Sequence, residues 1–244
     1  MQQLTLFGKT MSRSPRRPGA KTNVRHGPTS EMRWDLWTQE TEPEREMALF
    51  FLDIRNFTAL IEKRQALDVI HIVKKLFSTF QKIIHGHHGK IIDTSGDGFY
   101  AAFGFDGDVE KAVNASCNAG LAILKTLDYL NARSFEKNLL QRIEVGIGIH
   151  VGKVATDKLH LGSKDHLVVR GYPVNVASRL QATTRALHNN FIVSSAVYNH
   201  LKYSFRKSRP MKINLKGVSD PFELHLLGKP YQRPDLTSVL SRLE

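Results

Sequence analysis

Cysteine is almost absent from the sequence, and long apolar runs are absent altogether. Cys117 is the single cysteine among 244 residues, which excludes an intramolecular disulfide and a zinc site built from several cysteines. No apolar stretch reaches the roughly 18 residues that a membrane-spanning helix needs, and the first residues lack the apolar core of a signal peptide. These absences lead us to expect a cytoplasmic protein, with Cys117 a small buried residue of a helix.

Acidic residues are missing from residues 1–30, which carry six lysines and arginines. Half of the net charge of +12 therefore lies in a stretch that cannot build a core. We predict a disordered basic tail over 1–30, solvated or in weak contact with an anionic partner, and a docking segment over 31–45 that holds Trp34 and Trp37. The rest of the chain lacks the aromatic platforms and basic stripe of nucleic-acid-binding proteins, so no specific nucleic-acid partner is expected.

The body of the chain has the patterns of a mixed α+β domain. The predicted order β-α-β-β-α-β is the ferredoxin-like arrangement, an antiparallel sheet backed by helices, with extra strands toward the C-terminus. We predict one catalytic domain over 46–228 and a C-terminal tail over 229–244. Strands are expected over residues 47–52, 90–93, 99–103, 143–151, 167–169, 191–193, 211–215 and 222–227, and helices over 67–84, 108–131, 174–185 and 196–201.

Two aspartates lie at the ends of neighbouring predicted strands. Asp53 closes an apolar run, and Asp97 lies at the tip of a hairpin. If the first strand is central and the hairpin lies beside it, the two carboxylates meet, and they repel each other unless a cation lies between them. Mg²⁺ and Mn²⁺ prefer such oxygen ligands. Each aspartate also has a structural explanation, because Asp-Gly favours hairpin turns and Asp53 can cap a helix that begins near Phe57.

Two further patterns indicate a ligand or a close contact. Asn175 and Arg179 are four residues apart on a predicted helix, so they share a face that can orient a sugar and neutralise phosphate, or is an ordinary exposed face. Gly146, Gly148 and Gly152 share one face of a strand. Glycines there indicate that another backbone or a ligand comes close.

Five segments, in this order, resemble the motifs of class III nucleotidyl cyclases. The resemblance covers residues 46–227 and implies a head-to-tail homodimer with two shared sites, a nucleoside triphosphate substrate and two divalent ions, Mn²⁺ or Mg²⁺, at each site. Asp53, Asp97 and the carbonyl oxygen of Ile54 would hold the ions. The segments are FLDIRNFT (51–58), SGDGF (95–99), GIGIHVG (146–152), GYPVNVASRL (171–180) and LKG (215–217).

The same resemblance assigns roles to residues outside the metal motifs. Asn175 would orient the ribose, and Arg179 of the second chain would stabilise charge on the α-phosphate. Lys216 would bind the terminal phosphates, and Phe57 would contact the substrate. These roles are implied by the resemblance alone.

Two positions depart from the pattern of the purine-selective members of this family. They usually carry a lysine where this chain has Asp93, and an aspartate or threonine where it has Val168. An ionised aspartate accepts but does not donate a hydrogen bond, and valine does neither. In this respect the chain resembles the pyrimidine cyclases of bacterial anti-phage signalling, the Pycsar type, which make cyclic UMP or cyclic CMP.

We therefore predict that the enzyme cyclises a pyrimidine nucleotide, UTP ahead of CTP, for a downstream cyclic-nucleotide-binding effector. Arg170 would join Asp93 and Val168 in reading the base, and Phe50 and Tyr100 would narrow the pocket if their side chains faced it. Cyclisation of ATP or GTP by an atypical pocket is the alternative. An inactive nucleotide-binding module is a further one.

Overall fold

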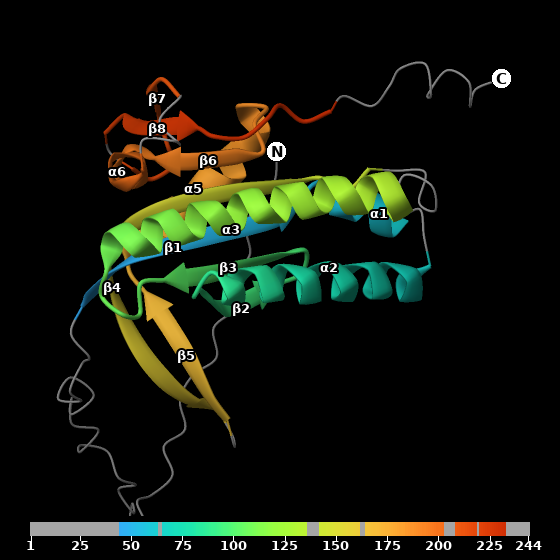
Figure 1. The fold of residues 1–244 in the computed structure, drawn as a ribbon, viewed down its shortest axis with the longest axis horizontal. Coiled ribbons are helices and arrows are strands. Elements are labelled where there is room, and N and C mark those ends of the chain that lie inside the picture. The colour runs from blue at the N-terminus through green and yellow to red at the C-terminus, as the bar shows by residue number, and fades with distance from the viewer. Residues whose placement is uncertain are drawn as a thin grey trace, which may run out of the picture. The chain divides into compact units, whose positions relative to one another are not determined.

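The computed structural model describes residues 44–62, 65–135, 142–161, 164–202, 208–218 and 220–232. The predicted tail over 1–30 and all but the last two residues of the docking segment over 31–45 lie outside this part of the chain. Figure 1 shows the strands as a twisted sheet with helices packed against it. No helix among the described residues is long and apolar enough to cross a membrane.

Every predicted strand and helix is present, and most ends shift by only one to three residues. The strands are β1 (Arg45–Ile54), β2 (Lys90–Ser95), β3 (Gly98–Phe103), β4 (Val145–Leu161), β5 (Lys164–Arg170), β6 (Phe191–Ser194), β7 (Met211–Ile213) and β8 (Phe222–Leu226). The helices are α1 (Phe57–Glu62), α2 (Ala66–Gly86), α3 (Val109–Leu130), α5 (Tyr172–Ala186) and α6 (Ser195–His200), with a π-helical turn, η2 (Asn131–Phe135), after α3.

The main sheet has the strand order β2-β3-β1-β4-β6-β8-β7. Its pairs are antiparallel except β4 with β6, which run parallel. β1 is internal, pairing with β3 on one side and along its whole length with β4 on the other. The predicted α+β class, with a largely antiparallel sheet backed by helices, is confirmed.

One face of the sheet is covered by α2 and α3. Phe50 and Leu52 of β1 point to this side, into a fully buried cluster with Phe80 of α2 and Cys117 of α3. Figure 1 shows α3 along β1 and α2 along β2 and β3. Burial raises the pKa of the Cys117 thiol to about 12, so this thiol is protonated and unreactive at neutral pH. The prediction that Cys117 is a buried helical residue is confirmed.

The opposite face is covered by α5, which comes unusually close. A side chain at Gly148 of β4 would place its Cβ only 2.2 Å from the backbone nitrogen of Gln181 in α5. At Gly152 the added Cβ would lie 2.7 Å from the ring of Pro173. Of the two explanations for the glycine face, the close approach of another chain segment is therefore the one observed at Gly148 and Gly152.

β4 is the element that differs most from its prediction. It continues ten residues beyond the expected end at Val151, to Leu161. Its outer half pairs only with β5, from Ala155 with Arg170 to Leu161 with Lys164, and Figure 1 shows the two strands as an arm that leaves the body. The strand predicted over 167–169 is present as β5, but within the described residues it pairs with β4 alone.

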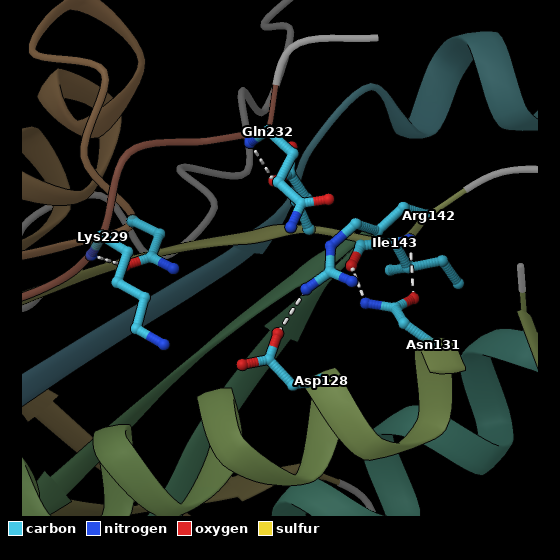
Figure 2. Close-up of polar contacts among 8 residues, drawn as sticks. Asp128, Asn131, Arg142, Ile143, Lys229 and Gln232 are labelled. Carbon is cyan, nitrogen blue, oxygen red and sulfur yellow. Dashed lines mark hydrogen bonds and ion pairs between the residues drawn. The ribbon is translucent and has the colours of Figure 1, made fainter. Parts of the chain in front are cut away.

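The described residues after β8 are tied to the body, and positions 233–244 of the tail predicted over 229–244 lie outside the described residues. We call residues 227–232 the C-terminal strap. The carbonyl of Lys229 accepts a hydrogen bond from the Asn190 amide at 2.9 Å, and the Lys229 amide donates to the Asn190 side chain at 2.8 Å. The Gln232 amide donates to the carboxylate of Glu144 at 2.8 Å, and Figure 2 shows both attachments.

Candidate active site

A cavity of about 260 Å³ opens where β1 ends. The chain turns there from β1 into α1, and the hairpin between β2 and β3 reaches the same edge of the sheet. The cavity is polar because most of its lining comes from this turn and from charged side chains. The lining residues are Asp53, Ile54, Arg55, Asn56, Phe57, Thr58, Asp97 and Arg185.

Sheet pairing brings the two predicted metal ligands together. Asp53 lies opposite Gly98 in the β1–β3 register, and Gly98 directly follows Asp97 in the chain. The Ile54 amide donates a hydrogen bond to the Asp97 carbonyl at 3.1 Å, which locks the two turns to each other. Burial, followed by the negative charge of Asp97, raises the pKa of Asp53 from 3.8 to about 6. The pair therefore favours a bound proton or a cation.

The donor set fits a divalent ion with open coordination positions. Asp53 and Asp97 offer hard carboxylate oxygens, and Ile54, whose carbonyl is the third predicted ligand, borders the same cavity. The described part of the chain holds no group of three or more His, Cys, Asp and Glu side chains placed to bind a metal. An ion here would thus keep positions for water or phosphate oxygens, as Mg²⁺ usually does.

Arg55 is a cavity residue that the sequence did not single out. Its guanidinium donates to the Gln181 carbonyl at 3.3 Å and to the Thr184 hydroxyl, and its Nε donates to the Tyr231 hydroxyl at 3.1 Å. Gly146 leaves the space, because an added Cβ there would lie 2.2 Å from the guanidinium. The positive charge of Arg55 partly opposes the rise in the pKa of Asp53. An arginine inside the aspartate motif was the available signal.

The last turn of α5 reaches the same cavity. Arg185 donates a hydrogen bond to the Asn56 side chain at 3.3 Å. Asn56 has a φ of 55°, a left-handed conformation that asparagine tolerates better than most residues. Phe57, predicted to contact the substrate, follows as the first residue of α1 and lines the cavity.

The three predicted base-reading residues lie around Tyr100. Asp93 is directly opposite Tyr100 in the β2–β3 register, and the Tyr100 hydroxyl donates to the Val169 carbonyl at 3.1 Å. Val168 and Arg170 flank that carbonyl in β5. Burial, followed by the charge of Asp93, raises the pKa of Tyr100. The Tyr100 side chain thus links Asp93 of β2 with the segment of β5 that carries Val168 and Arg170.

The aromatic residues suggested to narrow the pocket differ from each other. Phe50 is fully buried on the side of α2 and α3, so the suggestion is wrong for this residue. Strand alternation explains this, because Phe50 and Asp53 are an odd number of residues apart and face opposite sides. Tyr100 lies on the face of Asp53 and stacks on Phe51, with ring centroids 5.0 Å apart.

Asn175, Arg179 and Lys216 form a second group. Asn175 is exposed on α5, and the Arg179 guanidinium donates to the Gly217 carbonyl at 3.1 Å, beside the exposed Lys216. The carbonyl contact brings the predicted phosphate-binding arginine and lysine into one neighbourhood. None of the three residues lines the cavity of Asp53 and Asp97.

Comparison with known proteins assigns the family. The model of the adenylate and guanylate cyclase catalytic domain matches residues 39–229. The chain belongs to this family. It is 31% identical over 160 residues to an adenylate cyclase of Anabaena cylindrica, covering 64% of this chain and 31% of that protein. It is 27% identical over 184 residues to adenylate cyclase 1 of Rhizobium meliloti, covering 74% of this chain and 27% of that protein. The chain thus spans about a third of the length of these relatives or less.

Solved structures have the same fold as this class III cyclase domain. The adenylyl cyclase CyaB from P. aeruginosa superimposes with a TM-score of 0.68 at 22% identity, covering 81% of this chain and 100% of that one. The guanylyl cyclase Cya2 gives a TM-score of 0.69 at 22% identity, covering 78% and 97%. The resemblance to class III cyclases is confirmed.

Proposed function

We propose that this protein converts a nucleoside triphosphate into its 3′,5′-cyclic monophosphate and pyrophosphate, with a catalytic domain over residues 46–228. The observation that carries the proposal is the meeting of Asp53 and Asp97 at one cavity, beside Ile54. Burial, followed by the negative charge of Asp97, raises the pKa of Asp53, and a cation bound between the two carboxylates would offset this cost. Asp53, Asp97 and the Ile54 carbonyl are the groups that would hold two divalent ions, Mn²⁺ or Mg²⁺.

Bound divalent ions would neutralise the triphosphate and make the ribose 3′-hydroxyl more acidic. In the reaction this hydroxyl loses its proton to solvent, and its oxygen forms a bond to the α-phosphorus. The bond from that phosphorus to the pyrophosphate oxygen breaks. Asn175 would orient the ribose, Arg179 would stabilise the charge that develops on the α-phosphate, and Lys216 would bind the terminal phosphates.

We infer that the working site is shared between two copies of the chain, paired head to tail. Asn175 and Arg179 lie on α5 and are not among the residues that line the cavity of their own chain. If these residues act on the nucleotide held at Asp53 and Asp97, a second copy must bring them. Each dimer would then contain two such sites.

For the base, we propose a pyrimidine, UTP ahead of CTP. Asp93 accepts hydrogen bonds when ionised, Val168 offers only apolar contact, and Arg170 is an exposed donor beside them. A purine edge left unpaired costs about 1–3 kcal/mol per missing bond, so two losses disfavour ATP by roughly 30- to 10⁴-fold. An anti-phage role, a downstream effector and a cytoplasmic location follow from the sequence resemblance and composition, and stay predictions.

Purine cyclisation is the second candidate, since the relatives named above are adenylate cyclases and the similar structures include an adenylyl and a guanylyl cyclase. One experiment separates the two. The purified protein is incubated with each of the four nucleoside triphosphates and Mn²⁺, pyrophosphate is measured, and the products are identified by mass spectrometry. We expect cyclic UMP or cyclic CMP to form fastest. Equal or faster formation of cyclic AMP or cyclic GMP would refute the pyrimidine assignment.

Substitutions test the metal ligands and the shared site. Asp53→Asn and Asp97→Asn should each remove more than about nine tenths of the activity, and Asp68→Asn, at an exposed position of α2, is the matched control. Mixing inactive Asp53→Asn with inactive Arg179→Ala should restore part of the activity, because a mixed dimer holds one intact site. Exchange of subunits without recovery would show that the site lies within one chain.

A further inference from the structure

The turn that carries the predicted metal ligands is held by Arg55, a residue of the same motif to which the resemblance assigns no role. Arg55 directly follows Asp53 and Ile54, and its guanidinium has three acceptors: the Gln181 carbonyl, the Thr184 hydroxyl and the Tyr231 hydroxyl. The Tyr231 ring also faces the guanidinium carbon at 5.5 Å, within the range of a cation–π contact. The side chain of Arg55 is thereby fixed in one position.

Tyr231 is itself held in place by the C-terminal strap. The strap is attached at residue 190 through the Lys229 backbone and at Glu144 through the Gln232 amide. The ring of Tyr231 meets His188 edge-on, with centroids 5.8 Å apart. Figure 2 shows the backbone attachments of Lys229 and Gln232, residues that lie before and after Tyr231 in the chain.

Glu144 provides a second link between the strap and the turn. Its carbonyl accepts a hydrogen bond from the Arg55 amide at 2.7 Å, while its carboxylate accepts one from Gln232 at 2.8 Å. One residue thus contacts both the strap and the backbone of the turn. A displacement of the strap would therefore also shift the turn, through the contacts of Arg55 and of Glu144.

We propose that Arg55 and Tyr231 are positioning residues for the metal-binding turn, and that the C-terminal strap is a working part of the active site. The inference rests on the proposed function, because it assumes that Asp53, Ile54 and Asp97 hold the ions. Metal ligands must be fixed within a fraction of an ångström, and their supporting residues commonly change metal affinity about 10- to 100-fold. Tyr231 does not line the cavity, and the hydrogen bonds of the Arg55 guanidinium go to α5 and to the strap.

Tyr231→Phe is the most selective test. It keeps the ring over Arg55 and removes only the hydroxyl that accepts from Nε. The control is Tyr129→Phe in α3, where a second tyrosine ring lies 5.3 Å from the guanidinium carbon of Arg133. Arg55→Lys, which keeps the charge and loses the forked geometry, is the second test variant.

Metal affinity is the readout, since it does not require turnover. Free Mn²⁺ is counted by electron paramagnetic resonance during titrations with 3′-deoxy-ATP and, separately, 3′-deoxy-UTP, which lack the attacking hydroxyl. We expect Mn²⁺ to bind about tenfold more weakly to Tyr231→Phe and to Arg55→Lys, and unchanged to Tyr129→Phe. A role in stability alone would lower the melting temperature and leave the Mn²⁺ affinity of the folded protein as it was.

The results separate this inference from the proposed function. If Asp53→Asn binds Mn²⁺ as tightly as the natural chain, the metal site itself is misplaced and both proposals fall. If Asp53→Asn loses Mn²⁺ while Tyr231→Phe and Arg55→Lys keep full affinity, the metal site stands and the positioning role is overturned. Loss of affinity in all three variants, but not in the control, supports both.

Discussion

The two faces of the central sheet are built by different means. Toward α2 and α3 the strands present large apolar side chains, and stability comes from burying rings such as Phe50, Phe80 and Phe103. Toward α5 the same strands present glycines, a stacked pair of aromatic rings and the carboxylate of Asp53. The first face is a core of ordinary composition, whereas the second combines close backbone packing with buried polar groups.

This difference assigns separate tasks to the two faces. The apolar core on the side of α2 and α3 leaves no room for a charged group. It holds the strands of the sheet rigidly, so the ends of β1 and β3 keep a fixed position relative to each other. The face of α5 can then hold groups that are unfavourable to bury, including the Arg55 guanidinium and the Asp53 carboxylate. Five predictions sharpen or break the comparison, from the largest effect to the smallest.

Gly148→Val should be the most damaging change on the face of α5. Its Cβ would lie 2.2 Å from the nitrogen and 2.7 Å from the Cα of Gln181, backbone atoms that cannot rotate away. We expect a loss of more than about 4 kcal/mol in the free energy of unfolding, measured by chemical denaturation. Gly86→Ala, where an added Cβ meets nothing within 4 Å, is the control and should be neutral. Equal stability of both variants would refute close packing as the reason for the glycine.

The same contrast explains which parts of the structure were predictable. The face of α2 and α3 follows from local sequence patterns, since residues 47–52 of β1 form a continuous apolar run and apolar residues recur at helical spacing in α2. The meeting of Asp53 and Asp97 required only that β1 be central and paired with the hairpin. Arg55 and Tyr231 left no such pattern, because they are 176 positions apart and a single arginine and a single tyrosine have no periodicity.

The arm formed by β4 and β5 was missed for a related reason. Beyond residue 154 the strand pairs with β5 and no longer with β1, so one-sided burial no longer enforces apolar alternation and the pattern fades. Lys158 and Leu159 are both exposed there, although they point to opposite sides of the strand. Apolar alternation in a sequence reflects one-sided burial, so a strand that buries few side chains cannot be recognised from this pattern.

Asn131→Ala tests a polar contact on the side of α3. Its side-chain amide donates to the Ile143 carbonyl at 2.8 Å and accepts from the Ile143 backbone amide at 2.9 Å (Figure 2). These bonds tie the end of α3 to the residues that lead into β4. Removing the side-chain amide leaves two buried backbone groups unpaired, so we expect a loss of about 3 kcal/mol in unfolding free energy. Asn118→Ala, at an exposed position of α3, should change it by less than about 0.5 kcal/mol. A small effect at Asn131 would mean that water replaces both bonds.

Lowering the pH should destabilise the protein through His150, on the side of the sheet that α5 covers. This side chain hydrogen-bonds the Ser194 hydroxyl at 2.9 Å, and burial lowers its pKa from 6.5 to about 4. As the pH falls from 7.5 to 5, His150 binds a proton in the unfolded chain before it does so in the folded one. The free energy of unfolding therefore drops by about 2 kcal/mol over this range. His150→Gln should flatten the dependence of unfolding free energy on pH, whereas His71→Gln, at an exposed position of α2, should leave it intact.

Protonation of Asp53 should change the free energy of unfolding in the opposite direction over part of the same pH range. Its pKa is raised to about 6, so the folded chain takes up the proton first and gains stability as pH falls from 6 to 4. The Asp53→Asn variant should therefore show a steeper acid loss than the natural chain. Measuring unfolding free energy against pH for both single variants separates the two contributions. An unchanged slope in Asp53→Asn would contradict the burial of this carboxylate beside Asp97.

Tyr100→Phe should have the smallest effect on stability and a specific effect on base choice. The hydroxyl that it removes donates to the Val169 carbonyl at 3.1 Å, and this bond holds β5 against β3 where Val168 and Arg170 lie. We expect a loss of about 1 kcal/mol in unfolding free energy, the usual contribution of one hydrogen bond. Tyr172→Phe, at an exposed position at the start of α5, is the control and should show no change.

Because β5 carries two of the three predicted base-reading residues, the kcat/KM ratio of UTP to ATP should fall in Tyr100→Phe while Mn²⁺ affinity stays constant. A ratio that does not move, in a variant that has lost the expected stability, would show that the position of β5 does not decide the base.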